Sequence, residues 1–366
     1  MTVLRRSPFA TASLLLIAAL PLGAQQYSWQ TRATFYADNT EFFTPYRVGE
    51  TILGGQVSTW LADQPGPRTT LRLGVFADRR WGSSAVADSV KPILAFRYQT
   101  RHALGVFGTL ETVNRHGLLE PLMVTTRELT TPIEYGGQWI ENAGPVHAES
   151  WINWQKLNTP TQREQFEIGN VLRVNAGKYF DLQGQHLWYH RGGQLFNPVP
   201  VTNNHAEALG AEAHDSLGWL GPISLAAWAL WSQGHIDPDT PPGRPDHGHG
   251  TYLRASINPW NWAEVFAIHW IGQDYNGDDG DNNYNSTGYD PTFYQPHRVY
   301  TEIGMIRRTP IEGGVTFDAE FRFHNIDNLK SIAFFNTHWE ISYRLVIRAP
   351  MDVILGHRHV TSVPAE

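Results

Sequence analysis

The chain contains 366 residues, including 14 tryptophans and 14 tyrosines, but no cysteine. Its 28 basic and 35 acidic residues are interspersed and give a net charge of −7, which argues against nucleic acid as a partner. Without disulfides, the chain must draw its stability from a large core or from a closed network of backbone hydrogen bonds.

The first 24 residues have the layout of a secretory signal peptide. Arg5 and Arg6 precede an apolar run at residues 13–20, and Ala24 is the small residue before the expected cleavage. The apolar run is too short for a membrane-spanning helix, which needs ~20 residues. Cleavage leaves 26 basic against 35 acidic residues, a net charge of −9. We therefore expect an exported chain, and no cysteine follows the cleavage position to carry a lipid.

From residue 27 onward, apolar and polar residues alternate over runs of roughly ten residues. The segment 315–324, VTFDAEFRFH, alternates five apolar with five polar or charged residues. Because successive side chains of a strand point to opposite faces, this segment is predicted as a strand with one apolar and one charged face. Sixteen such strands can be counted, from residues 27–37 to residues 333–348, and shifted boundaries allow 14 to 18.

Short and long connections alternate between these strands. A short link such as residues 100–102 is followed by a long one such as residues 113–131, and the long ones collect Gly, Pro, Asn and Asp. A soluble sandwich scatters its long connections over both ends, whereas an outer-membrane barrel has short periplasmic turns and long outer loops. The pattern predicts an all-β fold, a transmembrane antiparallel up-and-down β-barrel. We expect the long connections 38–49, 113–131, 234–249 and 274–297 to lie on the cell surface.

The layout of nearly the whole chain resembles the porin-like outer-membrane β-barrels of Gram-negative bacteria. Residues 38–46, DNTEFFTPY, resemble an Asp-Asn-x-Glu-aromatic-x-x-Pro-Tyr signature of barrels of the Bacteroidetes–Gemmatimonadetes kind, whose function is uncharacterised. The resemblance implies outer-membrane location, contact with lipid and lipopolysaccharide, and insertion by the barrel assembly machinery. Such barrels usually end on an aromatic residue, whereas this chain ends Val-Pro-Ala-Glu. We expect a signal peptide at 1–24, a barrel at 25–348, and a periplasmic tail or extra strand at 349–366.

In a barrel, the apolar face of each strand meets lipid and the charged face lines the lumen. Parity then places Phe321 against lipid and predicts that Phe321→Arg destabilises the barrel while Arg322→Glu is tolerated. The same parity gives ten lumen-lining candidates: Arg72, Asp78, Glu149, Asn153, Arg254, Asp318, Glu320, Arg322, Glu340 and Arg344. These residues either line a pore or pair across neighbouring strands. Four positive against five negative charges predict a nearly balanced lumen with weak cation preference.

Tryptophans near the predicted strand ends are typical of the aromatic girdles at the two membrane interfaces. A track for stacking sugars is the alternative. The candidates are Trp60, Trp81, Trp139, Trp154, Trp231, Trp260, Trp262, Trp270 and Trp339.

Metal sites and catalysis have weaker support. The segment 274–281, with Asp274, Asn276 and Asp278 as candidate ligands, resembles an oxygen-rich calcium loop but fails the EF-hand template, so we expect a solvated outer loop. The spacing of His235, Asp237, His247 and His249 matches no closed zinc set.

An ester hydrolase would need a Ser–His pair with an orienting group. His186, His190, Ser232 and Ser342 form no such motif, so we predict no enzyme and no cofactor.

The prediction for function is a passive porin-like channel that carries small polar solutes across the outer membrane. One alternative is a barrel-embedded enzyme or a surface protein that handles capsule or other polysaccharide. The other is a secreted, soluble β-protein that binds carbohydrate. Conductance and membrane fractionation separate the three.

Overall fold

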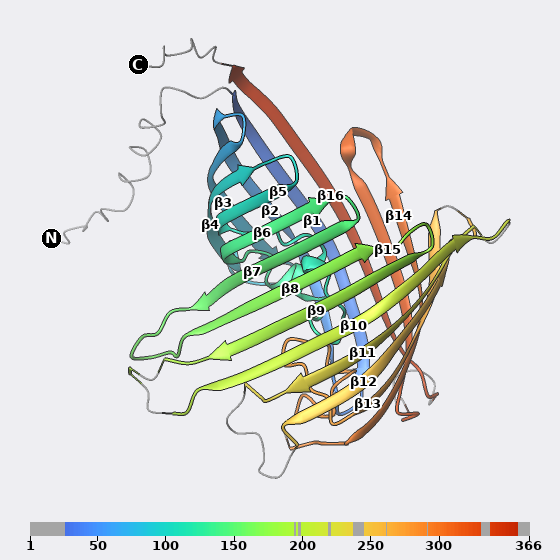
Figure 1. Ribbon diagram of the computed structural model, residues 1–366. Coiled ribbons are helices and arrows are strands. Elements are labelled where there is room, and N and C mark those ends of the chain that lie inside the picture. The colour runs from blue at the N-terminus through green and yellow to red at the C-terminus, as the bar shows by residue number, and fades with distance from the viewer. Residues whose placement is uncertain are drawn as a thin grey trace.

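The computed structural model describes residues 26–357, except 194, 197, 198, 219, 220, 237–244, 261, 291 and 331–336. The signal peptide predicted at 1–24 lies outside these residues. Sixteen strands form one closed antiparallel barrel, which confirms the predicted fold class and strand number (Figure 1). In the described part of the chain, no helix is both long and apolar enough to span a membrane.

Each strand pairs with its neighbours in the chain, and the last strand closes on the first. The strands are β1 (Gln26–Phe43), β2 (Val48–Gly66), β3 (Thr69–Arg80), β4 (Ser89–Gln99), β5 (Ala103–Thr109), β6 (Tyr135–Ala143), β7 (Val146–Lys156), β8 (Gln165–Asn175), β9 (Phe180–Arg191), β10 (Thr202–Ser216), β11 (Pro222–Gln233), β12 (His247–Ile257), β13 (Ala263–Gln273), β14 (His297–Pro310), β15 (Thr316–Ile326) and β16 (Glu340–His357). Three short helices are η3 (Val113–Gly117), α2 (Arg127–Thr130) and η5 (Glu312–Gly314).

The alternating pattern determines the two faces of the barrel wall. In β15, Phe321 and Phe323 are 48% and 46% exposed on the outside, while His324 is buried inside. The prediction for residues 315–324 is therefore confirmed. Similar exposed apolar side chains on the other strands give the barrel the apolar outer surface that a bilayer requires.

Two details of the predicted wall were wrong. Strands β1 and β2 continue into the stretch expected as a long loop at 38–49, so that only residues 44–47 connect them. The barrel was expected to end at residue 348, but β16 continues beyond it and pairs with β1 as far as His357. Residues 349–357 thus belong to the barrel, and the rest of the predicted tail lies outside the described residues.

Tryptophan positions agree only in part with the girdle interpretation. Six of the candidates are exposed, namely Trp81, Trp139, Trp154, Trp231, Trp260 and Trp262. Trp60 instead lines the interior, Trp270 is fully buried there, and Trp339 is half-buried. Trp60 and Trp270 occupy inward-facing positions of their strands. Closeness to a strand end does not show which way a side chain faces.

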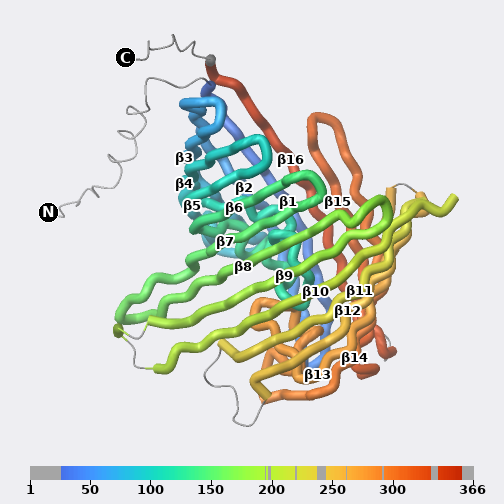
Figure 2. Tube along the Cα trace, in the orientation of Figure 1, coloured from blue at the N-terminus to red at the C-terminus, as the bar shows by residue number. Residues whose placement is uncertain are grey.

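Two long connections fold into the barrel instead of standing on its surface. We call residues 110–134, between β5 and β6, the first inner segment, and residues 274–296, between β13 and β14, the second inner segment. Figure 2 shows the first inner segment within the ring of strands, and Gln56 of β2 and Gln185 of β9 both donate hydrogen bonds to it. Tyr275 and Tyr284 of the second inner segment are fully buried in the same core. The expectation of a solvated acidic outer loop at 274–281 was wrong.

Candidate functional site

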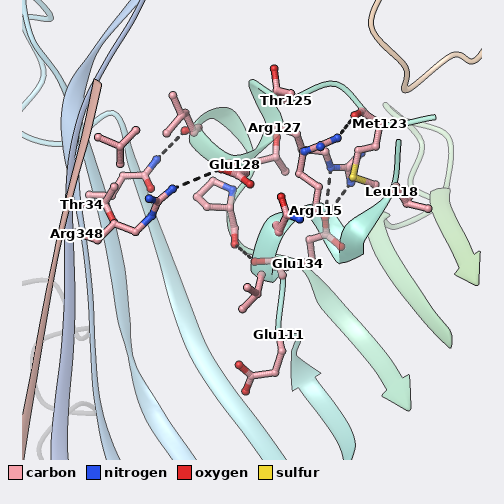
Figure 3. Close-up of a pocket in the computed structure, with 18 of the residues that line it drawn as sticks. Thr34, Glu111, Arg115, Leu118, Met123, Thr125, Arg127, Glu128, Glu134 and Arg348 are labelled. Atoms are coloured by element: carbon pink, nitrogen blue, oxygen red, sulfur yellow. Dashed lines mark hydrogen bonds and ion pairs between the residues drawn. The ribbon is translucent and has the colours of Figure 1, made fainter. Parts of the chain in front are cut away.

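The barrel interior contains a cavity of about 1000 Å³ between the wall and the first inner segment (Figure 3). Six of the ten predicted lumen residues line it: Arg72, Arg254, Asp318, Glu320, Arg322 and Arg344. Arg254 lies near the end of β12 and Asp318 near the start of β15, so the cavity occupies the half of the barrel that carries the short turns. In Figure 3, Arg348 points across the cavity toward Glu128, 3.7 Å away.

The other four predicted lumen residues also face inward but are covered. Asp78 accepts a hydrogen bond from Tyr36 at 2.6 Å, and Asn153 accepts one from the backbone of Tyr135 at 3.2 Å. Glu340 accepts the backbone N–H of Phe43 at 2.8 Å. Glu149 binds the first inner segment. These side chains hold loops and segments in place, and they do not line the main cavity.

The first inner segment is held to the wall by a cluster of buried charges around His116. Its Nδ1 lies 2.5 Å from Glu149 Oε1 and its Nε2 lies 3.2 Å from Glu134 Oε2. Its ring stacks on Trp151 at a centroid distance of 3.9 Å. Burial lowers the pKa of His116, but the hydrogen bonds to Glu134 and Glu149 outweigh it and raise the pKa above the usual value. A protonated His116 donates to both carboxylates.

Two arginines extend this attachment. Arg127 of α2 lies 3.1 Å from Glu134 and 2.5 Å from Glu167 of β8. Burial raises the pKa of Glu134, but the hydrogen bonds and positive charges of His116 and Arg127 lower it by more. The pKa of Glu134 therefore lies below its usual value. On the opposite wall, Arg322 lies 2.7 Å from Glu120 of the first inner segment. The segment is thus bound electrostatically on both sides.

The two inner segments pack against each other at glycines. A Cβ at Gly277 or Gly280 would lie 2.4 or 2.1 Å from the carbonyl oxygen of Pro121, so only glycine permits this approach. The Tyr275 hydroxyl donates to the same oxygen at 3.1 Å. Backbone bonds from Asp281 to Glu120 and from Val124 to Asp279, both 2.9 Å, complete the contact. Together the segments fill the barrel half that carries the long connections.

The candidate calcium ligands do not converge. Asp274 accepts hydrogen bonds from Tyr294 and Gln273, and Asp278 accepts the backbone N–H of Ile236. The side chain of Asn276 binds the backbone of its own segment. The described residues contain no group of three or more metal-ligating side chains, and Asp237 lies outside them.

Sequence reasoning missed the residues that attach the inner segments, above all His116, Glu120 and Arg127. No spacing pattern points to them, because their partners lie on distant strands. One signal was present: Leu118, Leu122 and Met123 are too apolar for a solvated loop, and all are buried.

A family model described as lipid A 3′-O-deacylase-type matches residues 20–358. The chain belongs to this family. No curated protein matches the chain.

The chain also resembles solved outer-membrane proteins. OmpT of Vibrio cholerae without its loop L8 is 7% identical, with a TM-score of 0.53 over 89% of this chain and 99% of that one. OccK8 (OprE) of Pseudomonas aeruginosa is 10% identical, with a TM-score of 0.51 over 90% and 99%. At these identities the likeness concerns the fold. The protein therefore has the fold of an outer-membrane β-barrel.

The outward-facing wall of the barrel carries a row of polar side chains on four adjacent strands. Ser150 donates to Asn170 at 2.8 Å, the Asn170 amide lies 3.3 Å from His186, and His186 lies 3.3 Å from His205. Glu207 is exposed on the same face. They face outward, because the alternate residues of these strands are the buried, inward ones. Polar groups facing hydrocarbon are rare and costly, so the row is a candidate site of lipid contact.

Proposed function

We propose that the protein is a narrow outer-membrane channel for small polar solutes, whose passage is restricted by the two inner segments. The observation that carries the proposal is the cavity of about 1000 Å³ inside a closed barrel, lined by nine arginines and six carboxylates. A polar wall of this kind lets a hydrated solute keep its hydrogen bonds. The inner segments would limit passage at the half of the barrel that carries the long connections.

We expect weak selectivity, because guanidinium groups and carboxylates in the cavity are paired. Arg72 lies 2.8 Å from Glu111, and Arg344 lies 2.5 Å from Asp38. The weak cation preference inferred from the sequence remains a prediction, and the excess of arginines along the cavity opposes it. Reversal potentials under a KCl gradient measure the sign. A strong preference for either ion would contradict the pairing argument.

Conductance in planar bilayers tests the channel proposal. Gly280→Val should drive Pro121 away and loosen the packing of the inner segments, so single-channel conductance should rise above that of the native protein. Gly66→Val is the matched control, since a Cβ there meets nothing within 4 Å. Folded protein is verified by its faster gel migration without boiling. Absence of conductance from both native protein and Gly280→Val would refute the proposal.

Hydrolysis of a membrane-lipid ester is the second candidate, favoured by the family and by the polar row on the lipid-facing wall. In this case His186 would contact the lipid and act as a general base. Mass spectrometry of lipid A from expressing cells should then show loss of an ester-linked acyl chain, which His186→Ala abolishes. His269→Ala is the matched control, because His269 also faces outward and binds Thr301 at 2.9 Å. Unchanged lipid A would eliminate this candidate.

A further inference from the structure

Strands β7 to β10 lie side by side on one face of the barrel and present the polar row on their outer surface (Figure 1). Contacts of 2.8 or 3.3 Å link its first four members, and its five members are Ser150, Asn170, His186, His205 and Glu207. Glu207 is exposed and lies directly opposite His186 in the strand register. Among the described residues, no arginine or lysine pairs with Glu207, whose direct neighbour on β11 is Trp231.

The acyl chains of a bilayer cannot satisfy these polar groups. A carboxylate or an imidazole that faces hydrocarbon loses its hydrogen bonds to water, and a lipid tail offers no replacement. Polar side chains on the surface of a second protein do offer one. The row therefore favours a protein partner over acyl chains.

The polar row is also complementary to itself. His186 and His205 offer imidazole groups that can donate hydrogen bonds, whereas the Glu207 carboxylate only accepts them. In a two-fold dimer, every contact between two different residues occurs twice. A two-fold axis along the membrane normal keeps both copies in the same orientation. Where this axis passes between His186 and Glu207, it brings the carboxylate of each copy to the imidazole groups of the other.

The wall beside the row has a shape suited to close contact. Leu172 of β8 and Leu209 of β10 are 47% and 62% exposed on either side of Gly184 of β9. A Cβ at Gly184 would meet only Leu209, at 4.0 Å, so the glycine leaves a depression between the two leucines. A leucine of a second copy can fill this depression and bring the two backbones close together.

The face formed by β7 to β11 is large enough for a stable contact. Strands lie ~4.8 Å apart, so these five strands are ~24 Å wide. The apolar outer band of such a barrel is ~25 Å tall. The face thus has ~600 Å² on each copy, and a dimer buries ~1200 Å² in total, more than the ~1000 Å² expected of a specific interface.

We infer that two copies of this chain form a two-fold dimer through the outer face of β7 to β11, in which Glu207 of each copy binds His186 and His205 of the other. The dimer goes beyond the proposed channel function, which a single barrel can perform. It also gives the polar row a protein partner in place of a lipid ester. Crosslinking, conductance and lipid A composition are separate measurements, so the failure of one does not decide the others.

Because the chain contains no cysteine, single introduced cysteines test the dimer directly. Leu172→Cys and Leu209→Cys place one thiol on each side of Gly184. In the full mature chain, folded in lipid vesicles, at least one of them should give a crosslinked dimer with a short bismaleimide. Leu73→Cys is the matched control, because Leu73 is 37% exposed on β3, six strands from β9 around the ring. Its crosslinking should stay at the level of random collision.

Glu207→Leu, added to the cysteine variant that crosslinks, tests the polar contact. Loss of a charged interface contact raises Kd about tenfold or more, and this contact occurs twice, so Kd should rise about 100-fold. Crosslinking of dilute protein should then fall to the control level. Thr301→Val is the matched control, since Thr301 is another polar residue of the outer wall and lies 2.9 Å from His269. Faster gel migration without boiling verifies that each variant is folded.

Three results would overturn the inference. The first is crosslinking of Leu172→Cys and Leu209→Cys no stronger than that of Leu73→Cys, and the second is crosslinking that Glu207→Leu leaves unchanged. Native mass spectrometry provides the third readout, in which we expect the mass of two chains. A single chain that retains a lipid would instead identify lipid as the occupant of the polar row.

Discussion

Arg322 is the residue whose removal should damage the barrel most, because one guanidinium lies among three carboxylates. It is 2.7 Å from Glu120 and 2.8 Å from Glu302, and it also binds Glu320. Its side chain is only 13% exposed, so water replaces little of what is lost. Removing one partner of a buried ion pair costs about 3–5 kcal/mol, and we expect Arg322→Met to fall in this range.

A matched arginine gives the scale for this effect. Arg308 also faces the cavity, but its side chain is 69% exposed and lies 3.8 Å from Glu264. Arg308→Met should change stability by less than about 1 kcal/mol, as for an exposed ion pair. Arg322→Glu, which parity alone predicts to be tolerated, should be the worst substitution, since it would bring four carboxylates together.

The assay is urea unfolding of barrels refolded into lipid vesicles, followed by tryptophan fluorescence. Adding Glu302→Gln to Arg322→Met should restore part of the lost stability, because it removes one uncompensated buried charge. Equal effects of Arg322→Met and Arg308→Met would refute the reasoning, since burial would then have no bearing on the cost.

Three further predictions follow from the wall, the inner cluster and the connections. Phe321→Arg should cost up to about 2–4 kcal/mol in the same assay, whereas Phe321→Leu should cost far less; equal costs would contradict the membrane-facing assignment. The raised pKa of His116 means that its stabilising contribution is complete below its unfolded pKa of about 6.5 and is lost as pH rises through its folded pKa. Protease cleavage of the first inner segment should therefore increase with rising pH, and His116→Gln should remove this dependence; an identical pH profile would refute it. An epitope inserted at Val86, which is 98% exposed, should bind antibody on intact cells, whereas one inserted at Arg101 should not; the reverse labelling would invert the orientation.

The sequence alone was sufficient to predict the strands of the barrel wall and the direction in which their side chains face. Whether a residue faces lipid or lumen depends on parity within its own strand, and parity is visible without knowledge of distant contacts. This is why the strand number and the ten inward residues could be predicted together. The last boundary was not predicted correctly, since Pro350 lies within β16, beyond the predicted end of the barrel at residue 348. Beyond Arg348, β16 pairs with β1 but no longer with β15, so its free edge tolerates a residue without an N–H.

The inner segments could not be predicted in the same way. The many Gly, Asn and Asp residues of the second inner segment are typical of solvated loops, yet Gly277 and Gly280 serve a close contact with Pro121. An epitope at Gly280, which the loop assignment would favour, would disrupt this packing. The contact between Ser342 of β16 and His324 of β15, 2.8 Å apart, was missed for a related reason. Its residues are joined by strand register, which no local motif records.

Pore lining and structural pairing, two alternatives for the charged lumen, apply to different halves of the barrel. Glu149 and Asp78 are fully engaged where the inner segments and long connections meet the wall, so their charges stabilise the fold and are not available to a solute. Arg72 and Arg254 face the open half, where each is paired yet stays within reach of the cavity. A solute in that half meets paired charges, so it gains little from either sign. In the proposed channel, discrimination would therefore come from the inner segments, which are held by the contacts of His116 and by the buried bridge from Glu120 to Arg322. In that proposal, the same contacts that stabilise the barrel would also decide what can pass through it.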